Sequence, residues 1–198
     1  ALYTDEKAAL NRFKSNLEAS PDDPLAHYGY ALALTRVDQW HEAAEHMKQA
    51  IEGNAMTTSM LQDLGKIYFH DGQYEKAMEA LSASHSEKDP ESRLYLGRTQ
   101  MELGRMAEAR DTFENLVRYN ENFTQAYYYL GESSGRIGDM FGAHYNLGRF
   151  YRQMGNLKNA GFHLNRAMKL AVDDAQKQMV AVQLKAMNPR KEKKPGAG

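Results

Sequence analysis

Residues 64–84 read LGKIYFHDGQYEKAMEALSAS, and this stretch decides the fold. Four other stretches align with it without a gap: YALALTRVDQWHEAAEHMKQA (30–50), LGRTQMELGRMAEARDTFENL (96–116), LGESSGRIGDMFGAHYNLGRF (130–150) and LGRFYRQMGNLKNAGFHLNRA (147–167). A motif that recurs at this length indicates an array of similar structural units. A small residue recurs in these stretches at intervals of 34, 32, 34 and 17 residues: Ala31, Gly65, Gly97, Gly131 and Gly148.

Each stretch has the pattern of two amphipathic helices joined by a tight turn. The turn positions hold residues that tolerate a left-handed backbone, namely Asp38, Gly72, Gly104, Gly138 and Gly155. Small residues in the second helix allow close approach: Ala43, Ala77, Ala109, Ala143 and Ala160. Bulky residues then fill the layer between hairpins: Met47, Leu81, Phe113, Leu147 and Leu164. One hairpin cannot bury such a stripe alone, so the pattern predicts stacked hairpins.

The composition of the 198 residues also favours helices. The chain has 25 Ala and 19 Leu but only 5 Val and 3 Ile, and β-branched residues are what a sheet core needs. We therefore predict an all-α fold. The net charge of −1 argues against a dedicated nucleic-acid binder, and the absence of Cys excludes disulfides and thiolate sites. No run of apolar residues is long enough to span a membrane.

Capping residues and turns place about eleven helices. Asp89–Pro90–Glu91 is a strong start signal, because an N-cap carboxylate precedes a proline at the first helical position. The expected helices cover residues 3–18, 24–37, 40–53, 57–71, 74–85, 90–103, 106–119, 124–137, 140–153, 157–171 and 174–187. The basic tail 188–198 has little to bury and is expected to be disordered.

These motifs resemble those of the tetratricopeptide repeat family. The family pattern of Leu-Gly, an aromatic, a turn Gly, Ala and a bulky residue is matched at Leu64–Gly65–Tyr68–Gly72–Tyr74–Ala77–Leu81. A second match is Leu147–Gly148–Tyr151–Gly155–Leu157–Ala160–Leu164–Ala167. The resemblance implies a right-handed superhelical array of antiparallel hairpins whose concave face binds a peptide or helix of a partner protein.

Two irregularities shape the expected organisation of the array over residues 1–187. Residues 1–23 align with the second half of a repeat, which fits either a capping helix or a chain cut from a longer protein. Full repeats are expected at 24–57, 58–89, 90–123 and 124–157. The 17-residue step then implies an overlapping, out-of-phase repeat at 141–173, followed by a capping helix at 174–187.

A more specific resemblance concerns the C-terminal repeat domain of bacterial envelope zinc metallopeptidases of the CAAX-protease-like class, such as the β-barrel assembly-enhancing protease. The segment AHYNLGRFYRQMGNLKNAGFHLNRAMKLA (143–171) carries it. It implies that the chain is a periplasmic or envelope-associated domain that docks partners or substrates. A protease domain would then precede it in the same polypeptide. The alternative is a free-standing adaptor in secretion, pilus or envelope assembly, expected in the cytoplasm if the protease resemblance fails.

By analogy with the family, the outward residues of the first helices are the candidates for partner binding. Four of them are basic and three are aromatic, which favours an extended or helical partner segment with some acidic character. The Lys/Asn pattern of the repeats that bind chaperone C-termini is not reproduced. The candidates are Tyr28, Leu32, Arg36, Gln62, Lys66, Phe69, His70, Leu94, Arg98, Met101, Tyr128, Glu132 and Arg136.

Motifs for catalysis are not found in the sequence. The nearest approach to the H-E-x-x-H zinc signature is HEAAEH (41–46), in which His41 and His46 are five residues apart and so point in different directions on a helix. The remaining histidines, His27, His70, His85, His144 and His163, are expected to be single surface or structural residues. We therefore expect no metal, no cofactor and no enzymatic activity in this chain.

Overall fold

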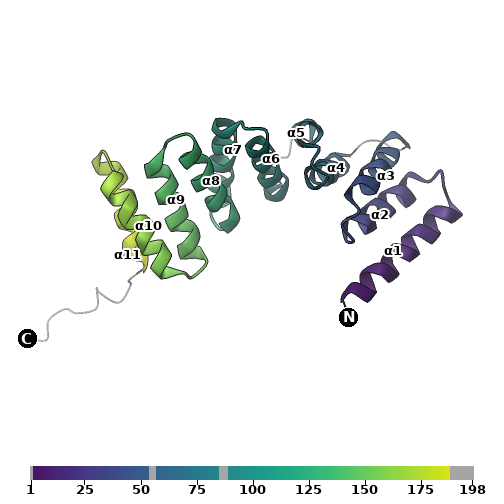
Figure 1. The fold of residues 1–198 in the computed structure, drawn as a ribbon, viewed down its shortest axis with the longest axis horizontal. Helices are drawn as coiled ribbons and strands as arrows, with labels where there is room; N and C mark the ends of the chain where they lie inside the picture. The colour runs from purple at the N-terminus through teal and green to yellow at the C-terminus, as the bar shows by residue number, and fades with distance from the viewer. Residues whose placement is uncertain (1, 54–56, 85–88, 188–198) are drawn as a thin grey trace, which may run out of the picture. The chain divides into compact units, whose positions relative to one another are not determined.

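The computed structural model describes residues 2–53, 57–84 and 89–187, and side chains from residue 5 onwards. These ranges contain eleven α-helices and no strand, which confirms the all-α prediction (Figure 1). The helices are α1 (Leu2–Ala19), α2 (Pro24–Thr35), α3 (Trp40–Gly53), α4 (Thr58–His70), α5 (Tyr74–Ala83), α6 (Pro90–Glu102), α7 (Met106–Tyr119), α8 (Thr124–Arg136), α9 (Met140–Gln153), α10 (Leu157–Leu170) and α11 (Asp174–Met187). The tail expected to be disordered lies outside the described residues.

Helix ends fall within two residues of the positions expected from the sequence, because local capping fixes them. The carboxylate of Asp23 accepts a hydrogen bond from the backbone N–H of Leu25, 3.0 Å away, and Pro24 opens α2. Asp89 accepts from the backbone N–H groups of Glu91 and Ser92 at the start of α6. These bonds satisfy N–H groups that a helix leaves without an internal partner.

The turn residues expected to need a left-handed backbone all have it. Asp38 has a φ of 58°, and Gly72, Gly104, Gly138 and Gly155 have φ values of 75°, 74°, 88° and 74°. Glycine adopts this conformation without steric strain, and aspartate tolerates it better than most residues. The prediction of five hairpin turns at these positions is therefore confirmed.

The chain divides into two compact units, Ala1–Leu103 and Gly104–Gly198. The core of the first unit lies between α2, α3, α4 and α5, with Leu34, Met47 and Leu81 almost fully buried. Helix α1 packs Leu10, Phe13 and Leu17 against this core. A Cβ atom added to Gly29 would lie 2.9 Å from the Phe13 ring, so the close approach of α1 and α2 depends on that glycine.

In the second unit, α9 packs against both α8 and α10. A Cβ atom on Gly131 would lie 2.8 Å from Leu147 Cγ, and one on Gly148 would lie 2.7 Å from Leu164 Cγ. Helix α9 thus receives a bulky residue from α10 in the same way that α8 receives one from α9. Helix α11 closes this unit against α10, with Val180 fully buried.

Candidate protein-binding groove

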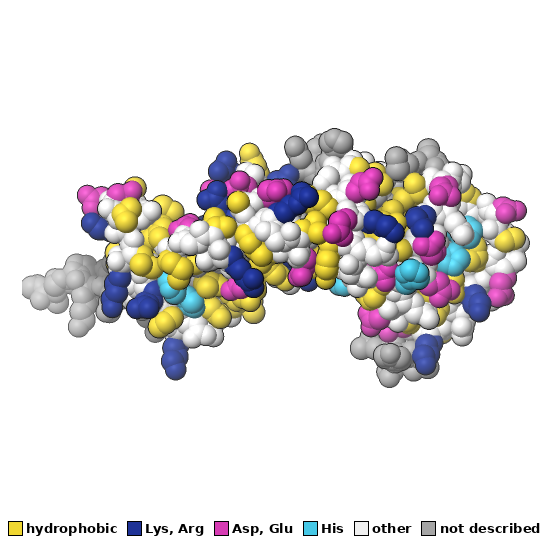
Figure 2. All heavy atoms as spheres, turned by 45° about the horizontal axis from the view of Figure 1, so that its top comes forward, with side chains coloured by type: hydrophobic (Ala, Val, Ile, Leu, Met, Phe, Trp, Pro, Cys, Tyr) yellow, Lys and Arg dark blue, Asp and Glu magenta, His cyan; other side chains and the backbone are white. Residues whose placement is uncertain are grey.

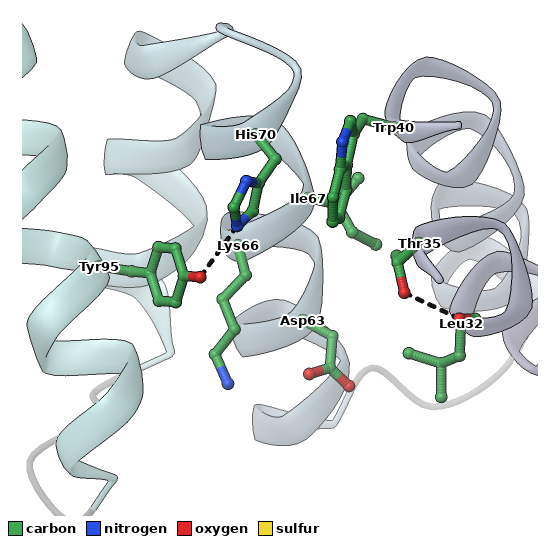
Figure 3. A pocket seen from close by; sticks show the side chains of 8 residues that line it. All are labelled: Leu32, Thr35, Trp40, Asp63, Lys66, Ile67, His70 and Tyr95. Carbon is green, nitrogen blue, oxygen red and sulfur yellow. Dashed lines mark hydrogen bonds between the residues drawn. The ribbon is translucent and has the colours of Figure 1, made fainter. Parts of the chain in front are cut away.

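A cavity of about 170 Å³ opens on the first unit between α2, α3, α4 and α6. We call it the Trp40 cavity (Figure 3). Its position along three successive first helices of the hairpins is where a partner was expected to bind. Its lining residues are Leu32, Thr35, Trp40, Asp63, Lys66, Ile67, His70 and Tyr95.

One side of the Trp40 cavity is apolar and aromatic. The indole of Trp40 stacks on the imidazole of His70, with ring centroids 4.3 Å apart and planes inclined by 16°. His70 Nε2 lies 2.9 Å from the hydroxyl of Tyr95. Burial, followed by the charge of Arg98, lowers the pKa of His70, although Asp38 opposes the shift. This shift favours the neutral form of the His70 ring.

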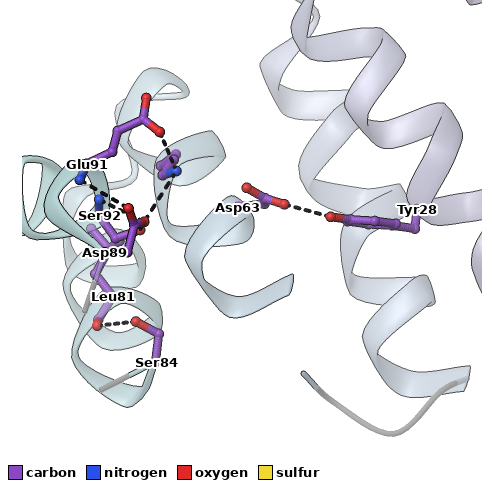
Figure 4. A network of polar contacts seen from close by, with 8 residues as sticks. Tyr28, Asp63, Leu81, Ser84, Asp89, Glu91 and Ser92 are labelled. Carbon is purple, nitrogen blue, oxygen red and sulfur yellow. Dashed lines mark hydrogen bonds and ion pairs between the residues drawn. The ribbon is translucent and has the colours of Figure 1, made fainter. Parts of the chain in front are cut away.

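The other side of the cavity carries charge in both signs. The hydroxyl of Tyr28 donates a hydrogen bond to Asp63 Oδ2 at 2.8 Å (Figure 4). Burial, and then the hydrogen bond and charge of Asp63, raise the pKa of Tyr28 to about 12. Lys66 Nζ lies 3.0 Å from Glu91 Oε2 and 3.8 Å from Asp89 Oδ2. These contacts hold Asp63 and Lys66 at the mouth of the cavity.

Arg98 of α6 lies next to the aromatic side of the Trp40 cavity. Its guanidinium carbon lies 4.4 Å from the centroid of the Phe69 ring and 5.1 Å from that of Tyr95. Cation–π contacts of this kind orient a long side chain over aromatic surface. Charges of both signs are also interspersed over the face of the molecule in Figure 2, in agreement with the net charge of −1.

The structure brings several of the expected residues together around this cavity. Leu32, Lys66 and His70 line it, while Tyr28 and Arg98 contact residues that do. Arg36 is exposed, and Gln62 and Met101 are partly buried. The expectation that Phe69 and Leu94 face outward is wrong, since only 8% and 3% of their surfaces are exposed.

The second unit holds the other three expected residues. Tyr128 is 36% exposed and shares a cavity of about 210 Å³ with Gln125, Tyr129 and Phe150. Glu132 and Arg136 line a separate cavity of about 340 Å³ together with His144. The role of all thirteen residues in partner binding stays a prediction.

Sequence reasoning missed Trp40, Asp63 and Tyr95. Asp63 precedes Lys66 by three residues, and Tyr95 precedes Arg98 by three, so each lies on the same helix face as a residue that was selected. Trp40 begins α3, and its contact with His70 joins two hairpins. The spacing of three residues along a helix could therefore have predicted Asp63 and Tyr95. The position of Trp40 is visible only in the tertiary structure.

The expectation of single residues is wrong for His27, His144 and His163, whereas His70 contacts Trp40 and Tyr95 and His85 lies outside the described residues. His27 and His46 approach with their Nδ1 atoms 2.9 Å apart, and His144 and His163 do so at 3.0 Å. Each pair joins the two helices of one hairpin, α2 with α3 and α9 with α10. The separation of 19 residues in both pairs was visible in the sequence.

The remaining histidine of the HEAAEH stretch is on the surface. His41 Nδ1 lies 3.2 Å from Asp71 Oδ2, and the two residues are far apart in the sequence. Within the described residues, no group of three or more His, Cys, Asp or Glu side chains is arranged to hold a metal ion. No described helix combines the length and apolar character needed to cross a membrane.

Three family models match parts of the sequence. Two of them describe the tetratricopeptide repeat and cover residues 94–140 and 141–173. Residues 94–173 carry tetratricopeptide repeats. The third model, subunit 3 of the anaphase-promoting complex (cyclosome), covers residues 51–116. The sequence matches no curated protein.

Several solved structures share the fold of this chain. A crystal structure of MamA aligns with a TM-score of 0.61 and 16% identity, covering 91% of this chain and 94% of that one. YrrB, described as a tetratricopeptide repeat protein with an unusual peptide-binding site, aligns with a TM-score of 0.57 and 18% identity, covering 86% and 97%. PilF of Pseudomonas aeruginosa aligns with a TM-score of 0.61 and 16% identity, covering 92% and 91%. At such identities the likeness concerns the fold alone.

Tetratricopeptide repeats are protein-interaction modules and are typically non-catalytic. The matched families and structures give no support to a link with a protease domain. The more specific resemblance noted in residues 143–171 is therefore not supported.

Proposed function

We propose that this chain is a non-catalytic scaffold that binds an extended segment of a partner protein in the Trp40 cavity. The observation that carries the proposal is the cavity itself, which combines an aromatic wall with Asp63 and Lys66 at its mouth. Its volume of about 170 Å³ suits one medium-sized apolar side chain. The partner segment then places a polar or charged residue beside Asp63 and Lys66.

Of the two functions that the sequence suggested, the free-standing adaptor has the better support. The chain aligns with nearly the whole length of the MamA and PilF structures. None of the three matched family models describes a peptidase. Docking within a larger envelope metalloprotease stays the alternative, and the mass of the native protein detected in its own cells distinguishes the two.

Charge reversal at the mouth of the cavity tests the proposal. We expect Lys66→Glu to abolish capture of partners from a lysate of the source cells, because it removes the cation and repels Asp63 and Glu91. Lys48→Glu is the matched control, since Lys48 also forms an ion pair, at 2.7 Å with Glu45, but does not line the cavity. Identical capture by wild-type protein and the Lys66 variant would overturn the proposal.

Trp40 supplies a second measurement. It is the single tryptophan of the chain and lines the cavity. A synthetic peptide from a captured partner is expected to shift the Trp40 emission on binding, because an apolar side chain replaces water beside the indole. Binding without any change in Trp40 emission would place the partner elsewhere on the molecule.

A further inference from the structure

The paired histidines of the α2–α3 hairpin have a geometry that their packing role alone does not require. His27 projects from α2 and His46 from α3, and their rings stack with centroids 5.1 Å apart and planes inclined by 25°. The two Nδ1 atoms are 2.9 Å apart. At that distance one nitrogen carries the hydrogen and the other presents a lone pair.

A hydrogen bond to the backbone determines which ring nitrogen of His27 carries no hydrogen. His27 Nε2 lies 2.8 Å from the carbonyl oxygen of Pro21. A carbonyl only accepts hydrogen bonds, so Nε2 of His27 carries the hydrogen, and the Nδ1 of the neutral ring is left with a lone pair. His46 Nδ1 is then the donor between the two rings. A carbonyl that fixes the tautomer in this way is the outer partner typical of a metal-binding histidine.

The distance between the two Nδ1 atoms matches the bite of two imidazoles on one metal ion. With metal–nitrogen distances of about 2.0–2.1 Å, adjacent ligands lie about 2.9 Å apart at a right angle and about 3.4 Å apart in a tetrahedron. A metal ion displaces the hydrogen from His46 Nδ1, and the neutral ring then carries its hydrogen on Nε2. Both rings must rotate so that their lone pairs converge on the ion, because the two Nδ1 atoms point toward each other in the metal-free arrangement.

Acidic residues lie on the same helix as His46. Glu42 is one turn before it on α3, and Glu45 directly precedes it. Glu42 also accepts a hydrogen bond from the Tyr30 hydroxyl at 3.4 Å, and the Tyr30 ring meets His46 edge-on. Within the described residues no third His, Cys, Asp or Glu completes the set, so water would fill the remaining coordination positions of a bound ion.

The second histidine pair provides an internal comparison. His144 and His163 have the same separation along the chain and an Nδ1–Nδ1 distance of 3.0 Å. In the described part of the chain, neither ring of this pair donates Nε2 to a backbone carbonyl. The carbonyl oxygen of Pro21, which fixes the tautomer of His27, therefore distinguishes the first pair from the second.

We propose that His27 and His46 form a binding site for a divalent transition metal ion such as Zn²⁺, which both rings coordinate through Nδ1 and which links α2 to α3. The proposal is independent of partner binding in the Trp40 cavity. Imidazole nitrogen suits zinc, nickel and copper, while magnesium and calcium prefer oxygen ligands. Affinity is therefore expected to be high for Zn²⁺ and Ni²⁺ relative to Mg²⁺.

Calorimetric titration of the full, untagged chain with ZnCl₂ tests this site. We expect wild-type protein to bind one Zn²⁺ ion more tightly than any further Zn²⁺ ions. With this ion bound, the protein is expected to unfold at a higher temperature. His46→Gln is expected to weaken the affinity for this Zn²⁺ ion at least about tenfold. His163→Gln, the matched change in the other pair, is expected to retain it. MgCl₂ is expected to give no comparable effect.

Nuclear magnetic resonance of the wild-type imidazoles gives a result that does not depend on a variant folding correctly. The ring nitrogen signals of His27 and His46 are expected to shift before those of His144, His163 and His41 as Zn²⁺ is added. The proposal is overturned if Zn²⁺ in large excess leaves these two rings unchanged. It is equally overturned if His46→Gln, folded by circular dichroism, binds Zn²⁺ as tightly as wild-type protein does.

Discussion

At the scale of single residues, glycines set how closely consecutive helices approach. Gly65, Gly131 and Gly148 each face a leucine of the following helix: Leu81, Leu147 or Leu164. A Cβ atom at any of the three would lie within 2.8 Å of the leucine Cγ. Since Leu164 is fully buried, it has no free space into which to move.

We therefore expect Gly148→Ala to destabilise the protein by about 1–3 kcal/mol, the usual range for overpacking a core. The matched control is Gly135→Ala, because a Cβ there would meet Ala143 Cβ at 3.5 Å, an ordinary contact. That control is expected to be neutral or stabilising by up to about 1 kcal/mol through its higher helix propensity. Urea unfolding of both variants measures the difference, and equal effects would contradict this reading.

The His144–His163 pair makes stability depend on pH. Burial, and then Arg166, lower the pKa of His144; burial, and then His144, lower that of His163. Glu132 and Arg136 of α8 line the same cavity as His144, with opposite charges. A lowered folded-state pKa means that the unfolded chain binds more protons, so this contribution is present above the unfolded pKa of about 6.5 and is lost as the pH falls.

We expect wild-type protein to be less stable at pH 5 than at pH 7.5, and His163→Gln to show a smaller loss over the same interval. Urea unfolding at the two pH values measures this. Because His46 and His70 also have lowered pKa values, the variant is expected to keep part of the dependence. An unchanged pH dependence in the variant would show that this pair does not contribute.

At the scale of secondary-structure elements, capping side chains fix where the helices begin. Asp89 accepts hydrogen bonds from Glu91 and Ser92 at the start of α6, and its carboxylate also lies 3.8 Å from Lys66. Asp139 and Asn156 cap α9 and α10 through their side chains in the same way. The position of α6 matters for function because Tyr95 and Arg98 extend from it toward the Trp40 cavity.

Asp89→Ala is expected to destabilise the protein by about 1 kcal/mol, the usual effect of losing an N-cap side chain. Asp89→Asn retains an oxygen acceptor without the charge and is expected to recover most of that loss. Thermal unfolding at one pH compares the three proteins. If Asn and Ala are equally destabilising, the ion pair with Lys66 and not the cap is the interaction that matters.

At the scale of the whole molecule, the chain divides into two compact units. In a repeat array, stability is approximately a sum of local terms and of terms between neighbouring repeats. The single tryptophan, Trp40, lies in the first unit, whereas helices of both units contribute to circular dichroism. The two signals therefore report on different parts of the same chain.

We expect Gly148→Ala, a change in the second unit, to shift the urea transition seen by circular dichroism more than the one seen by Trp40 fluorescence. Asp89→Ala in the first unit is expected to shift the Trp40 transition at least as much. Coincident transitions in all variants would show that the chain unfolds as one cooperative unit instead.

Much of the architecture was predictable from local patterns, and the functional surface only partly so. The five turn residues and the helix ends follow from backbone conformation and capping, which depend on a few adjacent residues. Lys66 and His70 were expected beside each other because residues four apart lie on one face of α4, and Leu32 lines the same cavity from α2. Phe69 and Leu94 were misplaced because periodicity does not tell how wide the buried face of a helix is.

The sequence by itself determined the helical class, the repeat and the turns, because these depend on composition and on residues close together in the chain. Only the tertiary structure showed that Trp40 stacks on His70, that Tyr28 bonds to Asp63, and that the histidines form two pairs. Each of these contacts joins residues 19 to 35 positions apart on different helices. Such contacts depend on how deeply one helix packs against the next, and side-chain volumes throughout each unit decide that together.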